Sequence, residues 1–226
     1  MRKTNIFLLL FSMLFLSMVN GQSTTSIEQR NEQIRQRWNR SLVRDSAYTF
    51  NKEVNNLLKQ TTAALPKGKA LCVAMGQGRN AMYLARNGWD VTGFDLADEA
   101  VAYAVEQAKK EQIPLKTEIT SFETFDYGEN KWDLITWLYG GCLWTEGITS
   151  TIKTALKPGG LFVFEFFHRD AGMKMNRPTF GCEENDIKQK FLDEGGFEIL
   201  LYEEKEGVAD YSLKPYKLVY MVVSKK

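Results

Sequence analysis

The sequence has few of the residues that hold metal ions or cross-link small folds. Its 226 residues include three cysteines, Cys72, Cys142 and Cys182, and a single histidine, His168. Three widely separated cysteines do not indicate a disulfide framework, and Cys72 lies in an apolar run where it is expected to pack as a small hydrophobic residue. No Cys-x-x-Cys or Cys/His spacing is present, so no metal site is expected.

An excess of charge of one sign is also lacking. The chain has 29 basic and 28 acidic residues, and removal of residues 1–21 leaves 27 basic residues against 28 acidic ones. A near-neutral chain lacks the electrostatic footprint of a nucleic-acid-binding protein. The basic residues are scattered, which does not favour steering to a membrane surface.

Long apolar runs are absent beyond residues 6–19, which follow Arg2 and Lys3. As a helix these 14 residues would rise about 21 Å, less than the roughly 30 Å of a bilayer core. The pattern is typical of a secretory signal. We therefore expect residues 1–21 to be a signal peptide or N-terminal anchor and the protein to be exported, either to a periplasm or out of the cell. The alternative is a membrane anchor that keeps the domain in the cytoplasm.

Two further regions follow. Residues 22–67 are polar with helical spacing at Ile34, Trp38 and Leu42, and they end at the breaker "LPKGK". From residue 68, apolar runs alternate with helical patterns, which predicts one α/β domain with a mostly parallel sheet. Strands are expected at 70–75, 90–95, 115–120, 132–138 and 161–167, with helices at 80–87, 98–111 and 148–160, the last ending in the turn "LKPGG".

The pattern changes after Cys182. A helix around Ile187 and Phe191 is expected to stop at Gly195 and Gly196. The runs at 197–204 and 216–225 then follow with no helix between them. Two such strands predict an antiparallel hairpin at one edge of the sheet.

The loop after the first strand carries the chemistry. Gly76 and Gly78 follow an apolar strand, where glycines allow a ligand to approach backbone amides at a helix N-terminus. Asp95 ends the next strand, where a carboxylate can accept hydrogen bonds from ribose hydroxyls. The pattern Gly76-x-Gly78-x-x-Ala81 fits dinucleotide loops and S-adenosylmethionine loops alike, and a tight turn without a ligand is the third interpretation.

The segments "ALCVAMGQGRNAMYLARNGWDVTGFDLADEAV", "WDLITW" and "LKPGGLFVFEFF" occur in this order. Together they resemble the class I S-adenosylmethionine-dependent methyltransferases, particularly the small-molecule branch with tellurite- and thiopurine-type enzymes. The resemblance covers residues 70–226. It implies a Rossmann-like, seven-stranded, mostly parallel sheet with helices on both faces and a C-terminal antiparallel hairpin. It further implies methyl transfer to a small-molecule acceptor, with residues 22–67 covering the cofactor site.

The resemblance also implies residue roles. The loop would cradle the methionine part of the donor, Asp95 would bind the ribose, and Leu96 would pack on the adenine. Three features depart from the family pattern: Cys72 stands where an acid is common, Ala74 replaces a glycine, and Ser121 replaces an aspartate. The residues expected at the cofactor are Ala74, Met75, Gly76, Gln77, Gly78, Arg79, Asp95, Leu96, Ser121, Phe122 and Trp137.

Two residues are candidates for catalysis. His168 follows the fifth strand, and its ordinary pKa of about 6.5 suits proton removal near neutrality. A hydrogen bond to backbone or to Asp170 is the alternative role for this histidine. Tyr139 follows the fourth strand in "WLYGG", where the Asn/Asp-Pro-Pro-Tyr/Phe signature of nucleic-acid amino methylation is absent.

Three functions remain open at this point: a small-molecule methyltransferase, an NAD(P)-dependent oxidoreductase that uses the same loop, and a non-catalytic protein that binds S-adenosylmethionine. The departures at Cys72, Ala74 and Ser121 favour the last of these. Binding of S-adenosylmethionine rather than NAD(P) separates the first two. The oligomeric state is not specified by the sequence.

Overall fold

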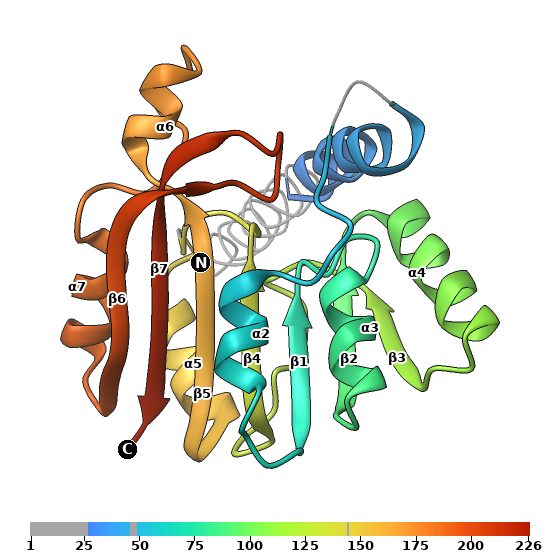
Figure 1. Cartoon of the computed structure of the whole chain (residues 1–226), viewed down its shortest axis with the longest axis horizontal. Coiled ribbons are helices and arrows are strands. Elements are labelled where there is room, and N and C mark those ends of the chain that lie inside the picture. The colour runs from blue at the N-terminus through green and yellow to red at the C-terminus, as the bar shows by residue number, and fades with distance from the viewer. Residues whose placement is uncertain (1–26, 46–48, 144) are drawn as a thin grey trace, which may run out of the picture.

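A seven-stranded sheet forms the centre of the protein (Figure 1), in a computed structural model that describes residues 27–45, 49–143 and 145–226. The strand order is β3-β2-β1-β4-β5-β7-β6. Neighbours pair in parallel from β3 to β5, whereas β7 pairs antiparallel with β5 and β6. The predicted fold class and its C-terminal hairpin are confirmed. The strands are β1 Lys69–Val73, β2 Asp90–Asp95, β3 Leu115–Ile119, β4 Trp132–Leu138, β5 Leu156–Phe167, β6 Phe197–Val208 and β7 Pro215–Lys225.

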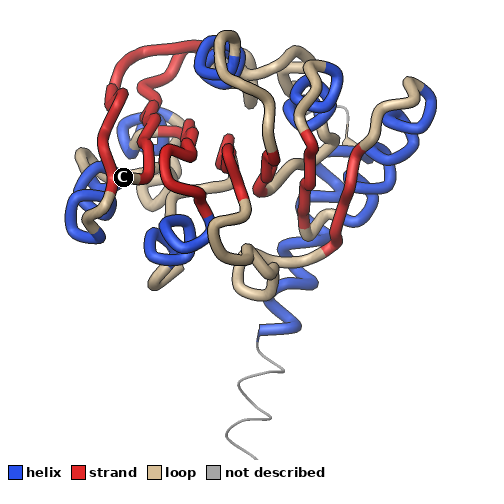
Figure 2. The backbone as a smooth tube through the Cα atoms, turned by 90° about the horizontal axis from the view of Figure 1, so that it is seen from below, coloured by secondary structure: helices blue, strands red, loops and turns tan. Residues whose placement is uncertain are grey.

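Helices cover both faces of the sheet, as the view from below in Figure 2 shows. Side chains of a strand alternate between faces, so a strand covered on both sides is apolar throughout. Ala70 and Cys72 of β1 pack with α2, α3 and α4, while Leu71 and Val73 pack in the core that contains α5 and α7. The helices are α2 Asn56–Thr62, α3 Arg79–Arg86, α4 Asp98–Lys110, α5 Ile148–Ala155, α6 Arg169–Lys174 and α7 Asp186–Glu194.

The N-terminal segment crosses the end of the sheet at which β1 and β2 finish (Figure 1). Residues 27–39 are helical and continue into the π-helical turn η1, Arg40–Arg44. Asn39 donates to Asp98 at 2.7 Å and accepts from the amide of Glu99 at 3.1 Å, which caps the first turn of α4. Within the described residues, no helix has the length and apolarity needed to cross a membrane. The expected signal peptide or anchor lies outside these residues.

The turn "LKPGG" differs from the prediction. It was expected to end α5, but the strand β5 already begins at Leu156. Leu156 is fully buried and pairs with Trp132, and a register shift between Trp132 and Leu134 accommodates the irregular segment before the regular pairing resumes at Leu161. Burial of this leucine explains why the chain joins the sheet before the glycines rather than after them.

The cysteine spacing indicated no disulfide framework, but the structure contains one disulfide bond. Cys142 and Cys182 form a disulfide bond, with 5.5 Å between their Cα atoms. Two backbone hydrogen bonds hold Cys182 beside the end of β5. The amide of Cys182 donates to Phe167 O at 2.9 Å, and its carbonyl accepts from Arg169 N at 2.7 Å. Cys72 is a buried free thiol, and burial raises its pKa to about 12.

Candidate active site

A tight glycine loop connects β1 to α3 at the carboxyl end of the sheet. Ala74, Gly76 and Gly78 all have left-handed backbone conformations, with φ of 51°, 53° and 79°. A Cβ atom on Gly78 would lie 2.8 Å from the Cβ of Ala104 in α4, so only glycine fits there. The loop therefore presents bare backbone at the start of α3, as expected for a ligand cradle.

Asp95 ends β2 beside this loop. Its Oδ2 accepts the amide of Gly76 at 2.8 Å, and its Oδ1 accepts the amide of Ala97 at 2.8 Å. Burial raises the pKa of Asp95, while these backbone amides act in the opposite direction by favouring the carboxylate. Each oxygen accepts one of these two hydrogen bonds and keeps acceptor capacity for a hydroxyl group. The geometry fits a ribose held by one carboxylate.

The other loop residues take different positions. Met75 is buried against Gly93 of β2, where a Cβ would collide with its sulfur. Gln77 donates from Nε2 to the carbonyl of Leu42 at 2.9 Å, which ties the loop to η1. Leu96 is half-buried directly after Asp95.

Ser121, Phe122 and Trp137 lie near the ends of β3 and β4. Ser121 is buried, and its Oγ lies 3.0 Å from the Oγ1 of Thr124. The rings of Phe122 and Trp137 are 4.5 Å apart, and the indole of Trp137 donates to Gly141 O at 3.1 Å. Because Trp137 is 1% exposed, it supports this end of the sheet from within the core.

A buried polar cluster, which the sequence did not reveal, adjoins the loop. Arg79 forms an ion pair with Asp210 from the loop between β6 and β7. Asn55 donates from Nδ2 to Glu165 Oε2 and to Asp210 Oδ2, both at 2.9 Å. Tyr139 donates from its hydroxyl to Glu165 Oε1 at 2.8 Å and accepts from the amide of Asp210 at 2.9 Å. We call Asn55, Arg79, Tyr139, Glu165 and Asp210 the carboxylate cluster.

The two carboxylates of this cluster are not balanced by cations. Glu165 and Asp210 are 3% and 5% exposed, and among the described residues Arg79 is the cation bonded to them. Burial raises the pKa of Glu165 to about 7, and the charge of Asp210 adds to this effect, whereas Asn55 opposes it. Burial and the neighbouring carboxylates hold the pKa of Tyr139 far above its ordinary value. Tyr139 is therefore a neutral hydrogen-bonding group in this arrangement.

Aromatic rings cover the cluster. Tyr211, next to Asp210, lies 4.9 Å from the ring of Tyr139, 4.8 Å from that of Phe50 and 6.0 Å from that of Trp38. Burial raises the pKa of Tyr211, and the charges of Asp95 and Asp210 add to this effect. The tip of the hairpin thus meets the N-terminal segment above the strand ends, as Figure 1 shows.

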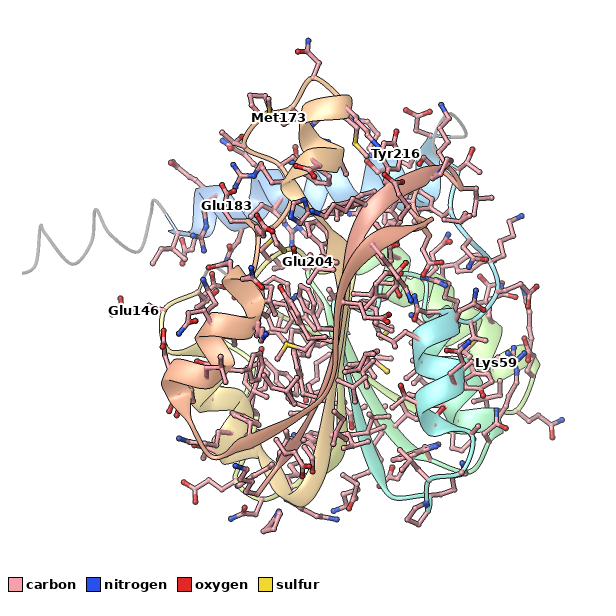
Figure 3. The ribbon with its side chains drawn as sticks, turned by 60° about the vertical axis from the view of Figure 1, so that its left-hand side comes forward. Lys59, Glu146, Met173, Glu183, Glu204 and Tyr216 are labelled. Atoms are coloured by element: carbon pink, nitrogen blue, oxygen red, sulfur yellow. A yellow bond between two sulfur atoms is a disulfide. The ribbon has the colours of Figure 1, made fainter. Side chains whose placement is uncertain are left out.

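His168 lies on the β6 side of this end of the sheet. Its Nδ1 accepts the amide of Asp170 at 3.1 Å and caps α6. Its Nε2 has no hydrogen-bond partner among the described residues and lies 3.4 Å from Oε2 of Glu204, a residue labelled below α6 in Figure 3. The backbone bond to Asp170 that the sequence offered as an alternative role is present. Tyr139 therefore lies in the carboxylate cluster with Arg79. His168 lies outside this cluster, in the neighbouring region between β5 and β6.

A family model and a curated relative connect this chain with methyltransferases. Residues 70–160 match the family model described as "Methyltransferase domain". The chain is 25% identical over 182 residues to "Hemagglutinin 1" of Eikenella corrodens, covering 76% of this chain and 59% of that protein. It is 27% identical over 143 residues to "Probable S-adenosyl-L-methionine-dependent methyltransferase TehB" of Haemophilus influenzae, covering 62% of this chain and 49% of that protein. The chain thus spans about half the length of the curated relatives it matches.

A solved structure shares the fold of this chain. The crystal structure of TehB from Haemophilus influenzae superimposes with a TM-score of 0.60 at 23% identity, over 76% of this chain and 63% of that one. The region that matches the family model, residues 70–160, includes the glycine loop and Asp95.

Proposed function

Since the chain carries a domain of the class I S-adenosylmethionine-dependent methyltransferase family, we propose that it transfers a methyl group from S-adenosylmethionine to a small-molecule acceptor. The observation that carries this proposal is the pairing of a bare glycine loop with Asp95 at the ends of β1 and β2. S-Adenosylmethionine supplies an activated methyl group, so the chain needs chiefly to bind and align the reactants.

The residues of the loop would hold the donor by its two polar ends. Asp95 would accept hydrogen bonds from the ribose, and the backbone at Gly76 and Gly78 would receive the methionine end. Leu96, Ser121 and Phe122 would form the adenine side of the site. We further propose that the N-terminal segment through residue 67 covers this donor site, since Gln77 of the loop binds the carbonyl of Leu42.

Deprotonation of the acceptor is assigned to the carboxyl ends of β4 and β5. His168 would serve as the base, because its unpartnered Nε2 lies at the end of β5. Tyr139 would orient neighbouring groups, because its hydroxyl is committed to Glu165 and to the amide of Asp210. If His168 is the base, His168→Asn lowers kcat for acceptors that carry a proton. An unchanged kcat would assign this residue to capping α6 alone.

Binding of S-adenosylhomocysteine and of NADH to the full chain, measured by calorimetry, tests the donor. We expect binding of the former and none of the latter. Radiolabelled S-adenosylmethionine, supplied with a panel of thiols, amines and oxyanions, then tests methyl transfer. Donor binding without transfer to any acceptor would favour the non-catalytic alternative, and NADH binding would favour an oxidoreductase.

We also propose that the protein is exported. The Cys142–Cys182 bond supports this location, because disulfides persist in oxidising compartments and are rare in the cytosol. Mass spectrometry of the mature N-terminus tests the proposal. Gln22 as the first residue would mean cleavage of the signal, whereas an intact N-terminus would favour the anchored alternative.

A further inference from the structure

The carboxylate cluster joins parts of the chain that are remote in sequence. Asn55 comes from the segment before α2, Arg79 from α3, Tyr139 from the end of β4, Glu165 from β5 and Asp210 from the hairpin loop. The N-terminal segment and the hairpin loop are also joined directly, because the amide of Asn51 donates to Asp210 O at 2.8 Å. The cluster is therefore the connection between the two segments that meet above the glycine loop.

The roof formed by these segments has little regular structure of its own. Residues 49–55 and 209–214 contain one antiparallel bridge, between Phe50 and Tyr211, and otherwise depend on side-chain contacts. Arg79 donates to the carbonyl of Glu53 as well as to Asp210, so one guanidinium holds both segments. Interactions at the cluster consequently decide whether the roof stays closed.

The charges of the cluster make closure depend on a proton. The amide of Asn55 donates to both buried carboxylates, the amide of Asn51 donates to Asp210 Oδ1 at 2.7 Å, and one guanidinium, Arg79, is ion-paired with Asp210. With both carboxylates ionised, the buried site carries one negative charge in excess, which desolvation and mutual repulsion oppose. Tyr139 and Tyr220 also face Glu165 from the elements packed around it. Neither residue carries a positive charge that would offset the excess negative charge.

We propose that Glu165 in its protonated form and Asp210 are positioning residues that clamp residues 49–55 and 209–214 over the donor site, and that these segments are released when Glu165 loses its proton and the two carboxylates repel each other. The clamp follows from the cluster alone. Its effect on the donor rests on the proposed function, since it assumes that the loop below binds S-adenosylmethionine. The raised pKa of Glu165 places the release near neutral pH.

When both carboxylates are ionised, their repulsion would increase the distance between Glu165 and Asp210. Asp210 is carried by a hairpin loop, whereas Glu165 is fixed within β5, so repulsion moves the loop rather than the strand. Movement of Asp210 would break its ion pair with Arg79 and displace the neighbouring ring of Tyr211. The donor would then lose its cover while Asp95 and the glycine loop stay in place.

Hydrogen exchange of the ligand-free full chain tests the clamp without any assumption about the donor. Wild type and Glu165→Gln are compared at each pH from 6 to 8.5, because intrinsic exchange rates cancel in this comparison. We expect amides in 49–55 and 209–214 of the wild type to lose protection above about pH 7, whereas the variant stays protected. Equal protection at all pH values would overturn the clamp.

Affinity for S-adenosylhomocysteine tests the functional part. We expect wild-type Kd to rise about tenfold between pH 7 and pH 8.5 relative to Glu165→Gln, since one proton taken up on closure changes affinity up to tenfold per pH unit. Glu206→Gln, an exposed acid of the same hairpin paired with Lys174, should follow the wild type. Parallel pH profiles for wild type and Glu165→Gln would overturn the proposal, whereas absence of binding by every variant would instead reject the proposed function.

If Glu165→Gln does not fold, hydrogen exchange of Asp210→Asn provides a second test of the clamp. Removing the charge of Asp210 relieves the repulsion and frees Arg79 for Glu165, which favours ionisation of Glu165. Ionised Glu165 then has no second carboxylate to repel, so the pH-dependent loss of protection should be absent from this variant. A loss of protection at the wild-type pH would contradict release by repulsion between the two carboxylates.

Discussion

Asp95, the last residue of β2, accepts the backbone amide of Gly76 through Oδ2 at 2.8 Å. This bond holds the glycine loop of one strand against the end of its neighbour. The same carboxylate accepts the amide of Ala97 before α4. One side chain thus organises two loops.

Loss of this carboxylate should weaken donor binding strongly. Asp95→Ala is expected to raise the Kd for S-adenosylhomocysteine about a hundredfold, because hydrogen bonds to a charged group contribute about 1.5–3 kcal/mol each. Calorimetric titration measures the change. Asp90→Asn is the matched control, since Asp90 lies at the opposite end of β2 in an exposed pair with Lys116. An unchanged Kd for Asp95→Ala would remove the basis of the proposed donor site.

Ala74 is held in a conformation that alanine disfavours. Its φ of 51° is left-handed, which costs a residue with a Cβ roughly 1–2 kcal/mol. Ala74→Gly is therefore expected to raise the free energy of unfolding by about 0.5–1 kcal/mol, as measured by urea denaturation. Ala85→Gly, in the ordinary helical turn of α3, should lower it by about 1 kcal/mol. Destabilisation by both substitutions would mean that the methyl of Ala74 is needed for packing.

Local sequence signals were sufficient for the sheet and for the position of the glycine loop beside Asp95. Gly76, Gly78 and Asp95 lie directly at the ends of two strands, so their proximity follows from parallel pairing of those strands. The hairpin was also predictable, because two strands followed each other without a helix. These features depend on short stretches of chain and on general rules of α/β topology.

The carboxylate cluster could not be predicted in the same way. Glu165 was visible as one acid in the apolar run "LFVFEFF", but its partner Asp210 depends on how far the hairpin extends. The strand β6 continues to Val208, beyond the expected end at Glu204, and this extension carries Asp210 to the N-terminal segment. The disulfide likewise required α6 and the following turn to return Cys182 to β5.

The Cys142–Cys182 bond should contribute substantially to stability. It closes a loop of 40 residues, for which the chain-entropy model gives roughly 4 kcal/mol. Replacing both cysteines with serine should lower the free energy of unfolding by about 2–4 kcal/mol in urea denaturation. A reductant should affect the unfolding of the wild type and leave that of the double variant unchanged. If the reductant has no effect on the wild type, the bond is absent from the protein in solution.

The final prediction concerns how stability depends on pH. The pKa of Glu165 rises from 4.5 to about 7 on folding, so the folded chain binds a proton that the unfolded chain has released within this window. Stability from this group is therefore present below about pH 4.5 and is lost as the pH rises through about 7, a difference of about 3 kcal/mol. Glu165→Gln should remove this part of the slope. Urea denaturation of both proteins between pH 5 and pH 8 measures it, and the other titrating groups cancel between them. Two parallel stability curves would mean that Glu165 is already ionised in the folded protein at pH 5.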